Sequence, residues 1–275
     1  MSTRRKIKNA INYIKVYFAI GVSVSILISI LLLIIINGLQ HLSWDFVFSM
    51  DAPRGFSLMP MIVTTAIVVF LTLLISAPLG IGAAIYLNEY ASTKSRLVKF
   101  VRVSIETLSG IPSIIYGLFG FLFYVIVLGW TWSIQAGIFT VSIMVLPIII
   151  RSSEEALKAV PMSFRMGSYA LGAGKFYTIR KVVLPAAMNG IIASIILSIG
   201  RLIGETAALL LTAGTLMDMP INLRSSAATL SVFMYTITVE QGDMERAYAT
   251  AIILMSLVLG LNLMANFIAR KIKKG

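Results

Sequence analysis

Five long apolar stretches limit what this chain can fold into more than any other feature. Four of them contain no charged side chain: residues 16–40, 55–88, 107–150 and 247–269. The fifth stretch, residues 186–216, contains only Arg201 and Glu205. Because about 20 apolar residues are enough to cross the hydrocarbon core of a bilayer, the chain is predicted to cross a membrane several times.

The stretch 107–150 is too long for one helix across a bilayer and long enough for two. Gly129, followed by Trp130 and Trp132, marks a turn at a membrane–water interface, where tryptophan is enriched. We therefore expect an all-α integral membrane protein that forms a single transmembrane domain. The six expected spans are residues 16–38, 60–87, 107–129, 133–150, 187–214 and 247–269.

The composition agrees with a membrane protein and excludes several other classes. Hydrophobic residues make up 58% of the chain and charged residues only 12%, too few to cover the surface of a soluble domain. The chain has no cysteine and a single histidine, His41. A disulfide framework and a metal site rich in Cys or His are therefore excluded.

The positions of the basic residues set the expected orientation. Of the 23 Lys and Arg residues, 19 lie in the two terminal segments and in the alternate loops 88–106 and 151–185, and three lie in the loops of the other side. By the positive-inside rule, both termini and the loop 151–185 are cytoplasmic. The net charge of +12 is thus explained by topology in a lipid bilayer and gives no reason to expect a nucleic-acid partner.

The cytoplasmic loop 151–185 is more organised than a simple connection. Ser152, followed three residues later by Glu155, is a capping-box pattern that predicts the start of a new helix. Pro161 is expected to end that helix. A second short helix is expected to end at Gly172, a residue suited to the left-handed helix cap.

The substring GAGK in this loop is not a nucleotide-binding loop. A Walker A motif needs a glycine five positions before its last glycine and Ser or Thr after its lysine. This chain has Tyr169 and Phe176 at those two positions. We therefore expect no cofactor in this chain itself.

Arg201 and Glu205 are expected to lie deep in the membrane, where a charged side chain costs about 2.5–3.5 kcal/mol on insertion scales. In one continuous helix, Ser198, Arg201 and Glu205 would share a face, because residues three or four apart lie on the same side. One interpretation is an ion pair that holds helices together. The other is an anion pathway, to which Thr206 also contributes, because the planar fork of arginine can donate two hydrogen bonds to a phosphate. In that pathway, Glu205 would orient the guanidinium or accept a hydrogen bond from a protonated phosphate oxygen.

The end of the cytoplasmic loop resembles the signature of ABC-importer permeases, E-A-A-x3-G-x9-I-x-L-P. Here Gly172 is followed, after nine residues, by Val182, Val183, Leu184 and Pro185. The positions that the family fills with Glu-Ala-Ala hold Met166, Gly167 and Ser168. In that family the signature forms a coupling helix that seats in a groove of the ATPase subunit. The resemblance assigns this coupling role to Arg165, Leu171, Gly172, Ala173, Leu184 and Pro185.

Four further segments narrow the resemblance to the PstA-type permeases of phosphate ABC importers, over about residues 59–216. The segments are APLGIGAAIYLNEYA, GIPSIIYGLFG, RSSEEALKAVP and RLIGETAALLLTAG. The resemblance implies a type I importer fold in a bacterial or archaeal cytoplasmic membrane. The implied partners are a PstC-like sister permease, a dimeric PstB-like ATPase that binds ATP and magnesium, and an external PstS-like phosphate-binding protein. It also suggests Arg151 as a contact for the anion on the exit side, the alternative being an anchor that sets topology.

The expected function is that of a permease subunit without catalytic residues, in an ATP-driven phosphate importer. One alternative is the same fold with sulfate, molybdate or another oxyanion as its substrate. A membrane-embedded enzyme would need Glu205 as its general base, and the absence of intramembrane His, Asp and Cys disfavours it. A proton-coupled secondary transporter is disfavoured because it would have no use for the organised cytoplasmic loop.

Overall fold

All regular secondary structure in the computed structural model, which describes residues 3–49, 57–92 and 94–272, is helical. The helices long and apolar enough to cross a membrane are α1 (Thr3–Leu39), α3 (Met59–Ile85), α6 (Ile134–Lys158), α9 (Leu184–Ile203) and α12 (Met244–Ile272). The shorter α-helices are α2 (Trp44–Phe48), α4 (Arg96–Ser109), α5 (Ser113–Gly120), α7 (Met162–Ala170), α8 (Lys175–Thr178), α10 (Ala207–Thr212) and α11 (Leu230–Val239). Three π-helical segments, η1 (Tyr86–Tyr90), η2 (Phe121–Val127) and η3 (Ile179–Val183), continue α3, α5 and α8. The prediction of an all-α membrane fold is confirmed.

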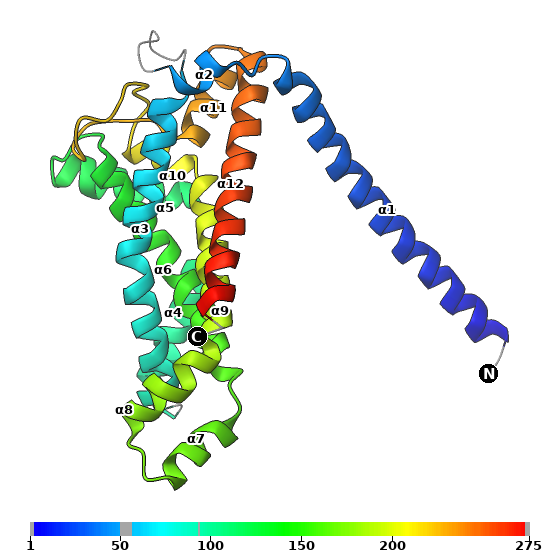
Figure 1. Ribbon diagram of the computed structural model, residues 1–275, viewed down its shortest axis with the longest axis vertical. Helices are drawn as coiled ribbons and strands as arrows, with labels where there is room; N and C mark the ends of the chain where they lie inside the picture. The colour runs from blue at the N-terminus through cyan, green and yellow to red at the C-terminus, as the bar shows by residue number, and fades with distance from the viewer. Residues whose placement is uncertain (1–2, 50–56, 93, 273–275) are drawn as a thin grey trace.

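The centre of the protein is a bundle in which α6 packs against α3 and α9, and α12 packs against α9 (Figure 1). The buried apolar side chains of these helices form one large cluster, to which Met144, Ile149 and Leu202 belong. Helix α1 instead diverges from the bundle and meets α12 near its own end, where Gly38 lies against Tyr248. From Asn12 onward its apolar side chains are mostly exposed, as suits a helix surrounded by lipid or by another subunit.

The elements at the two ends of the bundle are those that the distribution of basic residues predicts for the cytoplasmic and external sides. Helices α7 and α8 project beyond the bundle at one end, and the first turns of α1 and the last turns of α12 lie toward that end (Figure 1). Helices α2 and α11 lie at the opposite end. This arrangement agrees with a cytoplasmic location for both termini and for the loop 151–185.

The third span does not run as one helix over residues 107–129. Residues 107–109 belong to α4, and the chain then bends by 99° before α5 and η2 continue from Ser113 to Val127. Pro112 explains the break, because it has no N–H group and disfavours a helical conformation in the residue before it. The described residues therefore contain five helices that could each cross a membrane, and a sixth span only if the bent pair crosses as one unit.

The fourth span continues past its predicted end at residue 150. Helix α6 runs without interruption to Lys158, so the predicted helix start at Ser152 is wrong. Nothing between Arg151 and Lys158 interrupts the ladder of backbone hydrogen bonds, because these residues are good helix formers. The helix ends shortly before Pro161, as predicted.

The fifth span is also interrupted, at the point where its charged residues lie. Helix α9 ends at Ile203, and α10 begins at Ala207, so the predicted continuous helix over 187–214 is wrong. Glu205 holds this break together: its Oε1 accepts a hydrogen bond from the Ala208 N–H (3.1 Å), and its backbone carbonyl accepts one from Ser231 Oγ (2.7 Å). The freed backbone groups thus find partners within the protein, as a break at membrane depth requires.

The long external segment 215–246 contains a helix that the hydropathy pattern did not single out. Helix α11 packs against α12 and α3, and its Leu230, Val232 and Phe233 are fully buried. The side chain of Thr65 in α3 accepts a hydrogen bond from the backbone N–H of Leu230 (2.9 Å). This segment therefore closes the outer end of the bundle.

Two glycines of α3 test the close packing of α3 on α6. A Cβ atom added at Gly80 would lie 2.6 Å from Ile149 Cγ2, whereas one added at Gly82 would meet nothing within 4 Å. We expect Gly80→Ala to destabilise the protein by about 1–3 kcal/mol, the usual cost of overpacking. Gly82→Ala should leave the stability unchanged or raise it slightly, because alanine favours a helix over glycine. Thermal unfolding of both variants in the same detergent measures the difference, and equal midpoints would contradict this packing.

Candidate functional site

An open cavity of about 760 Å³ lies between α4, α6, α9 and α12. Its wall is mostly aliphatic, and its polar lining consists of Ser109, Arg151, Ser152, Arg201 and Asn262. The cavity thus brings together two arginines that sequence analysis assigned to the pathway from different segments. No acidic residue is among the described residues that line it.

Arg201 lies in the last turn of α9, at the edge of the helix break, and is exposed to the cavity. No ion pair joins Arg201 to Glu205 among the residues that the structure describes. The reason is the break itself, because the two residues no longer follow each other on one helical face. The predicted pairing of these two residues is therefore wrong, both as a contact that holds helices together and as a means of orienting the guanidinium.

Glu205, Ser198 and Thr206 lie off the cavity. The Glu205 side chain is buried and caps α10. Ser198 is fully buried, and its Oγ donates to the carbonyl of Ser194 (2.9 Å). The Thr206 hydroxyl makes only a long hydrogen bond to the carbonyl of Gly204 (3.4 Å). Glu205 and Ser198 thus make hydrogen bonds within α9 and α10, and none of these three predicted pathway residues lines this cavity.

Arg151 lies where the large cavity meets a smaller one of about 160 Å³. Its Nε is 3.2 Å from Glu155 Oε1 in the same helix, and its Nη1 is 3.4 Å from Glu106 Oε1 in α4. All three side chains are about half exposed or more, so these pairs contribute little to stability. The guanidinium is therefore available to a ligand that competes with the two carboxylates.

Asn262 of α12 is a polar lining residue that sequence analysis missed. Its Oδ1 is buried and has no hydrogen-bond partner among the described residues. An amide in an apolar span is itself a signal, since polar residues inside membrane helices are uncommon and face the interior of the bundle. Asn262 thus adds an amide to the wall of the cavity, with its oxygen buried in this conformation.

The segment formed by α7, α8 and the turn between them, residues 162–178, is the second candidate site. We call it the coupling segment. Its surface carries seven exposed apolar or aromatic residues: Met162, Phe164, Met166, Tyr169, Leu171, Phe176 and Tyr177. Leu171, at the turn, is 90% exposed. A cluster of this kind at the tip of a projecting segment is typical of a protein-binding surface.

Two buried contacts shape the coupling segment. The guanidinium of Arg165 makes a bidentate contact with the carboxylate of Glu89 in η1, and Ser168 Oγ is 2.8 Å from Thr178 Oγ1. Gly172 has a φ of +81°, the left-handed conformation that was predicted for it. Arg165, which was expected to contact the ATPase, is therefore turned inward.

The other residues assigned to coupling lie on either side of this turn. Leu171 and Gly172 are exposed and Ala173 is partly exposed, all three in the turn between α7 and α8. Leu184 and Pro185 form the first turn of α9, where proline is well tolerated because no N–H group is needed there. These last two residues connect the coupling segment to the helix that carries Arg201.

The described residues offer no metal site, since no three His, Asp or Glu side chains among them are grouped closely enough to hold an ion.

Comparison with known proteins identifies the family. The family model "Binding-protein-dependent transport system inner membrane component" matches residues 76–274. The probable ABC transporter permease protein YqgI of Bacillus subtilis is 33% identical over 269 residues, which cover 91% of each chain. A phosphate transport system permease protein PstA homolog of Mycoplasma pneumoniae is 40% identical over 222 residues, which cover 76% of this chain and 33% of that relative.

A solved structure confirms the fold. One chain of a bacterial alginate ABC transporter, solved in complex with an alginate pentasaccharide-bound periplasmic protein, superposes with a TM-score of 0.73 at 16% identity, and the match covers 98% of each chain. At this identity the likeness concerns the fold alone. The chain therefore belongs to the family of binding-protein-dependent transport system inner membrane components, and it is a non-catalytic, multi-pass permease subunit of an ABC importer.

Proposed function

We propose that this permease carries inorganic phosphate. The observation that carries the proposal is the cavity in which Arg151 and Arg201 face a common space without a carboxylate in its lining. Two guanidinium groups in a mostly apolar wall favour an anion, because the low local dielectric strengthens their attraction for it. The PstA homolog among the relatives supports phosphate as that anion.

Protonation distinguishes phosphate from the other oxyanions that the two arginines would attract. Near neutral pH phosphate carries one or two protons, which need hydrogen-bond acceptors, whereas sulfate carries none. An arginine only donates, but the hydroxyl groups of Ser109 and Ser152 and the amide of Asn262 can also accept. We assign this acceptor role to Asn262, which lines the cavity: its side-chain oxygen is buried without a partner, so rotating the amide to place this oxygen against the anion breaks no hydrogen bond of that oxygen, and Glu205 lies off the cavity.

The two arginines would act in sequence along the pathway. Arg201 lies at the break between α9 and α10, and Arg151 lies nearer to the cytoplasmic end of α6. Glu106 and Glu155 already compete for the guanidinium of Arg151. This competition keeps the binding of the anion weak enough for release, as transport requires.

Coupling to ATP hydrolysis is assigned to the exposed side of the coupling segment. Permeases of this family work with an ATPase and a binding protein. For this chain we propose a PstB-like ATPase dimer against the coupling segment, a PstC-like sister permease and a PstS-like external phosphate-binding protein. ATP and magnesium would be bound by the ATPase, with no cofactor in the permease.

The same fold with sulfate or molybdate as its substrate is the alternative, since two arginines attract any oxyanion. An uptake assay distinguishes phosphate from these alternative substrates. It uses the complete complex, reconstituted in vesicles with its ATPase and binding protein. We expect labelled phosphate to accumulate when ATP is supplied and a tenfold excess of unlabelled sulfate or molybdate to compete little. Strong competition by sulfate would favour the alternative.

Arg201 and Glu205 differ in their expected effect on transport. Arg201→Gln should abolish phosphate uptake while the complex still assembles, because a glutamine remains compatible with a position that faces a cavity. Glu205→Gln keeps an oxygen that can accept from the Ala208 N–H and should therefore retain most of the uptake. The initial rates of phosphate uptake into vesicles with equal amounts of protein measure the effect of both substitutions. Normal uptake by Arg201→Gln would exclude Arg201 from the pathway.

Asn262 is expected to affect selectivity more than assembly. Asn262→Leu removes the acceptor and should lower the preference for phosphate over sulfate by about three- to tenfold, roughly the value of one neutral hydrogen bond. Asn262→Asp keeps an acceptor but adds a negative charge to the cavity, so it should lower the uptake of both anions. Competition curves of the two variants provide the measurement. An unchanged selectivity in Asn262→Leu would mean that Asn262 does not contact the anion.

Leu171 tests the contact with the ATPase. Leu171→Asp should abolish co-purification of the ATPase without lowering the unfolding temperature of the permease, because this side chain is 90% exposed. Ile221→Asp is the matched control, since Ile221 is 91% exposed but lies in the external segment. If both variants retained the ATPase equally, Leu171 would not lie in the contact.

A further inference from the structure

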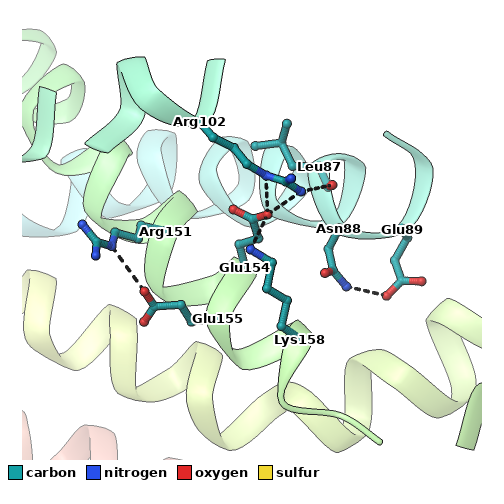
Figure 2. A network of polar contacts seen from close by, with 8 residues as sticks. All are labelled: Leu87, Asn88, Glu89, Arg102, Arg151, Glu154, Glu155 and Lys158. Atoms are coloured by element: carbon teal, nitrogen blue, oxygen red, sulfur yellow. Dashed lines mark hydrogen bonds and ion pairs between the residues drawn. The ribbon is translucent and has the colours of Figure 1, made fainter. Parts of the chain in front are cut away.

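A buried polar network ties α4 to the cytoplasmic ends of two membrane helices, as Figure 2 shows. Arg102 of α4 donates from Nε to Glu154 Oε1 (2.9 Å) and from Nη2 to the carbonyl of Leu87 (2.9 Å). Glu154 belongs to α6, and its side chain is only 9% exposed. Leu87 belongs to η1, the continuation of α3. One guanidinium therefore joins α4, α6 and η1.

A second guanidinium, more deeply buried than that of Arg102, joins the coupling segment to the same two helix ends. Arg165 Nη2 donates to Glu89 Oε1 (2.7 Å) and to the carbonyl of Leu157 (3.0 Å). Its Nη1 donates to the carbonyl of Val160 (2.8 Å). The side chains of Arg165 and Glu89 are 10% and 5% exposed. One residue further along η1, the ring of Tyr90 receives the ammonium group of Lys175 from α8, 4.7 Å from the ring centroid.

The two arginines use the same chemistry. Each guanidinium bonds one carboxylate and at least one backbone carbonyl near or beyond the end of a helix, where the carbonyl groups carry partial negative charge. The planar fork of arginine can serve several acceptors at once, which a lysine ammonium cannot do with the same geometry. The ends of α3–η1 and α6 are therefore held from two sides, by α4 through Arg102 and by the coupling segment through Arg165.

Helix α6 connects this network to the cavity. Arg151 and Ser152 of α6 line the cavity, and Glu154 lies two residues further along the same helix. Leu157 lies one further turn along the same helix. The other helix held by the network, α4, contributes Ser109 to the cavity wall. Helix α6 therefore joins the coupling segment, through Arg165, to the residues around the proposed anion site.

We propose that Glu89 and Arg165, together with Arg102 and Glu154, form a polar network that transmits a displacement of the coupling segment to the residues lining the cavity. We call this network the latch. We treat these as positioning residues, since none of the four is among the described residues that line the larger cavity. The proposal rests on the proposed coupling role of residues 162–178. A buried ion pair contributes little net stability but fixes geometry strongly, because moving either partner leaves an uncompensated charge. That property suits a mechanical link better than a stabilising one.

The experiment compares transport with ATP hydrolysis in the complete reconstituted complex. Glu89→Gln keeps the shape and removes the charge, and Arg165→Lys keeps the charge and removes the fork. In both variants we expect the ATPase to remain bound and to hydrolyse ATP at the basal rate, because the exposed apolar side of α7 is unchanged. The amount of phosphate taken up per ATP hydrolysed should fall by about three- to thirtyfold, the range seen for changes within coupling networks.

Lys158→Gln is the matched control. Lys158 pairs with the same oxygen of Glu154 (2.9 Å), but its side chain is 51% exposed and bonds no helix-end carbonyl. This variant should keep the wild-type ratio of uptake to hydrolysis. Unfolding temperatures and gel filtration of every variant show whether a change in that ratio occurs in a folded, assembled complex.

Two results would overturn the latch. The first is a wild-type ratio of uptake to hydrolysis in both Glu89→Gln and Arg165→Lys. The second is a parallel loss of assembly, hydrolysis and uptake, which would make the contacts structural only. Failure of the proposed function would show elsewhere, because the wild-type complex itself would then take up no phosphate.

Discussion

A charge placed inside an apolar helical bundle must be paired, hydrogen-bonded or open to water, and this constraint shapes the inner half of the protein. Arg102 and Arg165 satisfy it with buried carboxylates and helix-end carbonyls. Arg201 satisfies it differently, by facing a cavity. Arg151 combines both solutions, with two half-exposed carboxylates beside it and a cavity in front of it. The arginines thus divide into those that hold the structure and those that remain available to an anion.

The interruptions of the helices place these groups. The bend at Pro112 brings Ser109, the last residue of α4, to the cavity. The break after Ile203 leaves Arg201 in the last turn of α9, next to the break. Such breaks are tolerated at membrane depth only where the protein supplies partners for the freed backbone groups, which Glu205 and Ser231 do here. The same helix interruptions therefore place Ser109 and Arg201 at the cavity.

Helix α6 is the element through which the two candidate sites communicate. It packs against α3 and α9 in the core, carries Arg151 at the cavity, and ends at carbonyl groups held by Arg165 of the coupling segment. Its uninterrupted course past residue 150 matters for this reason. A helix that restarted at Ser152 would have a flexible joint between the cavity and the coupling segment, whereas a continuous helix transmits displacement along its axis.

The sequence alone determined that this is a helical membrane protein, on which side its basic loops lie, and that Gly172 has a left-handed conformation. These features depend on local composition and on single residues, so no tertiary contact is needed to predict them. The pairing of charges was decided only by the tertiary structure. Glu205 turned away from Arg201 because the helix breaks at Gly204 and its carboxylate accepts a hydrogen bond from the free N–H of Ala208, as a cap of α10. Arg165 turned inward because a glutamate 76 positions earlier in the chain lies against it. Regular helical spacing cannot predict either contact, since the first depends on a break within the helix and the second on where the fold brings distant segments together.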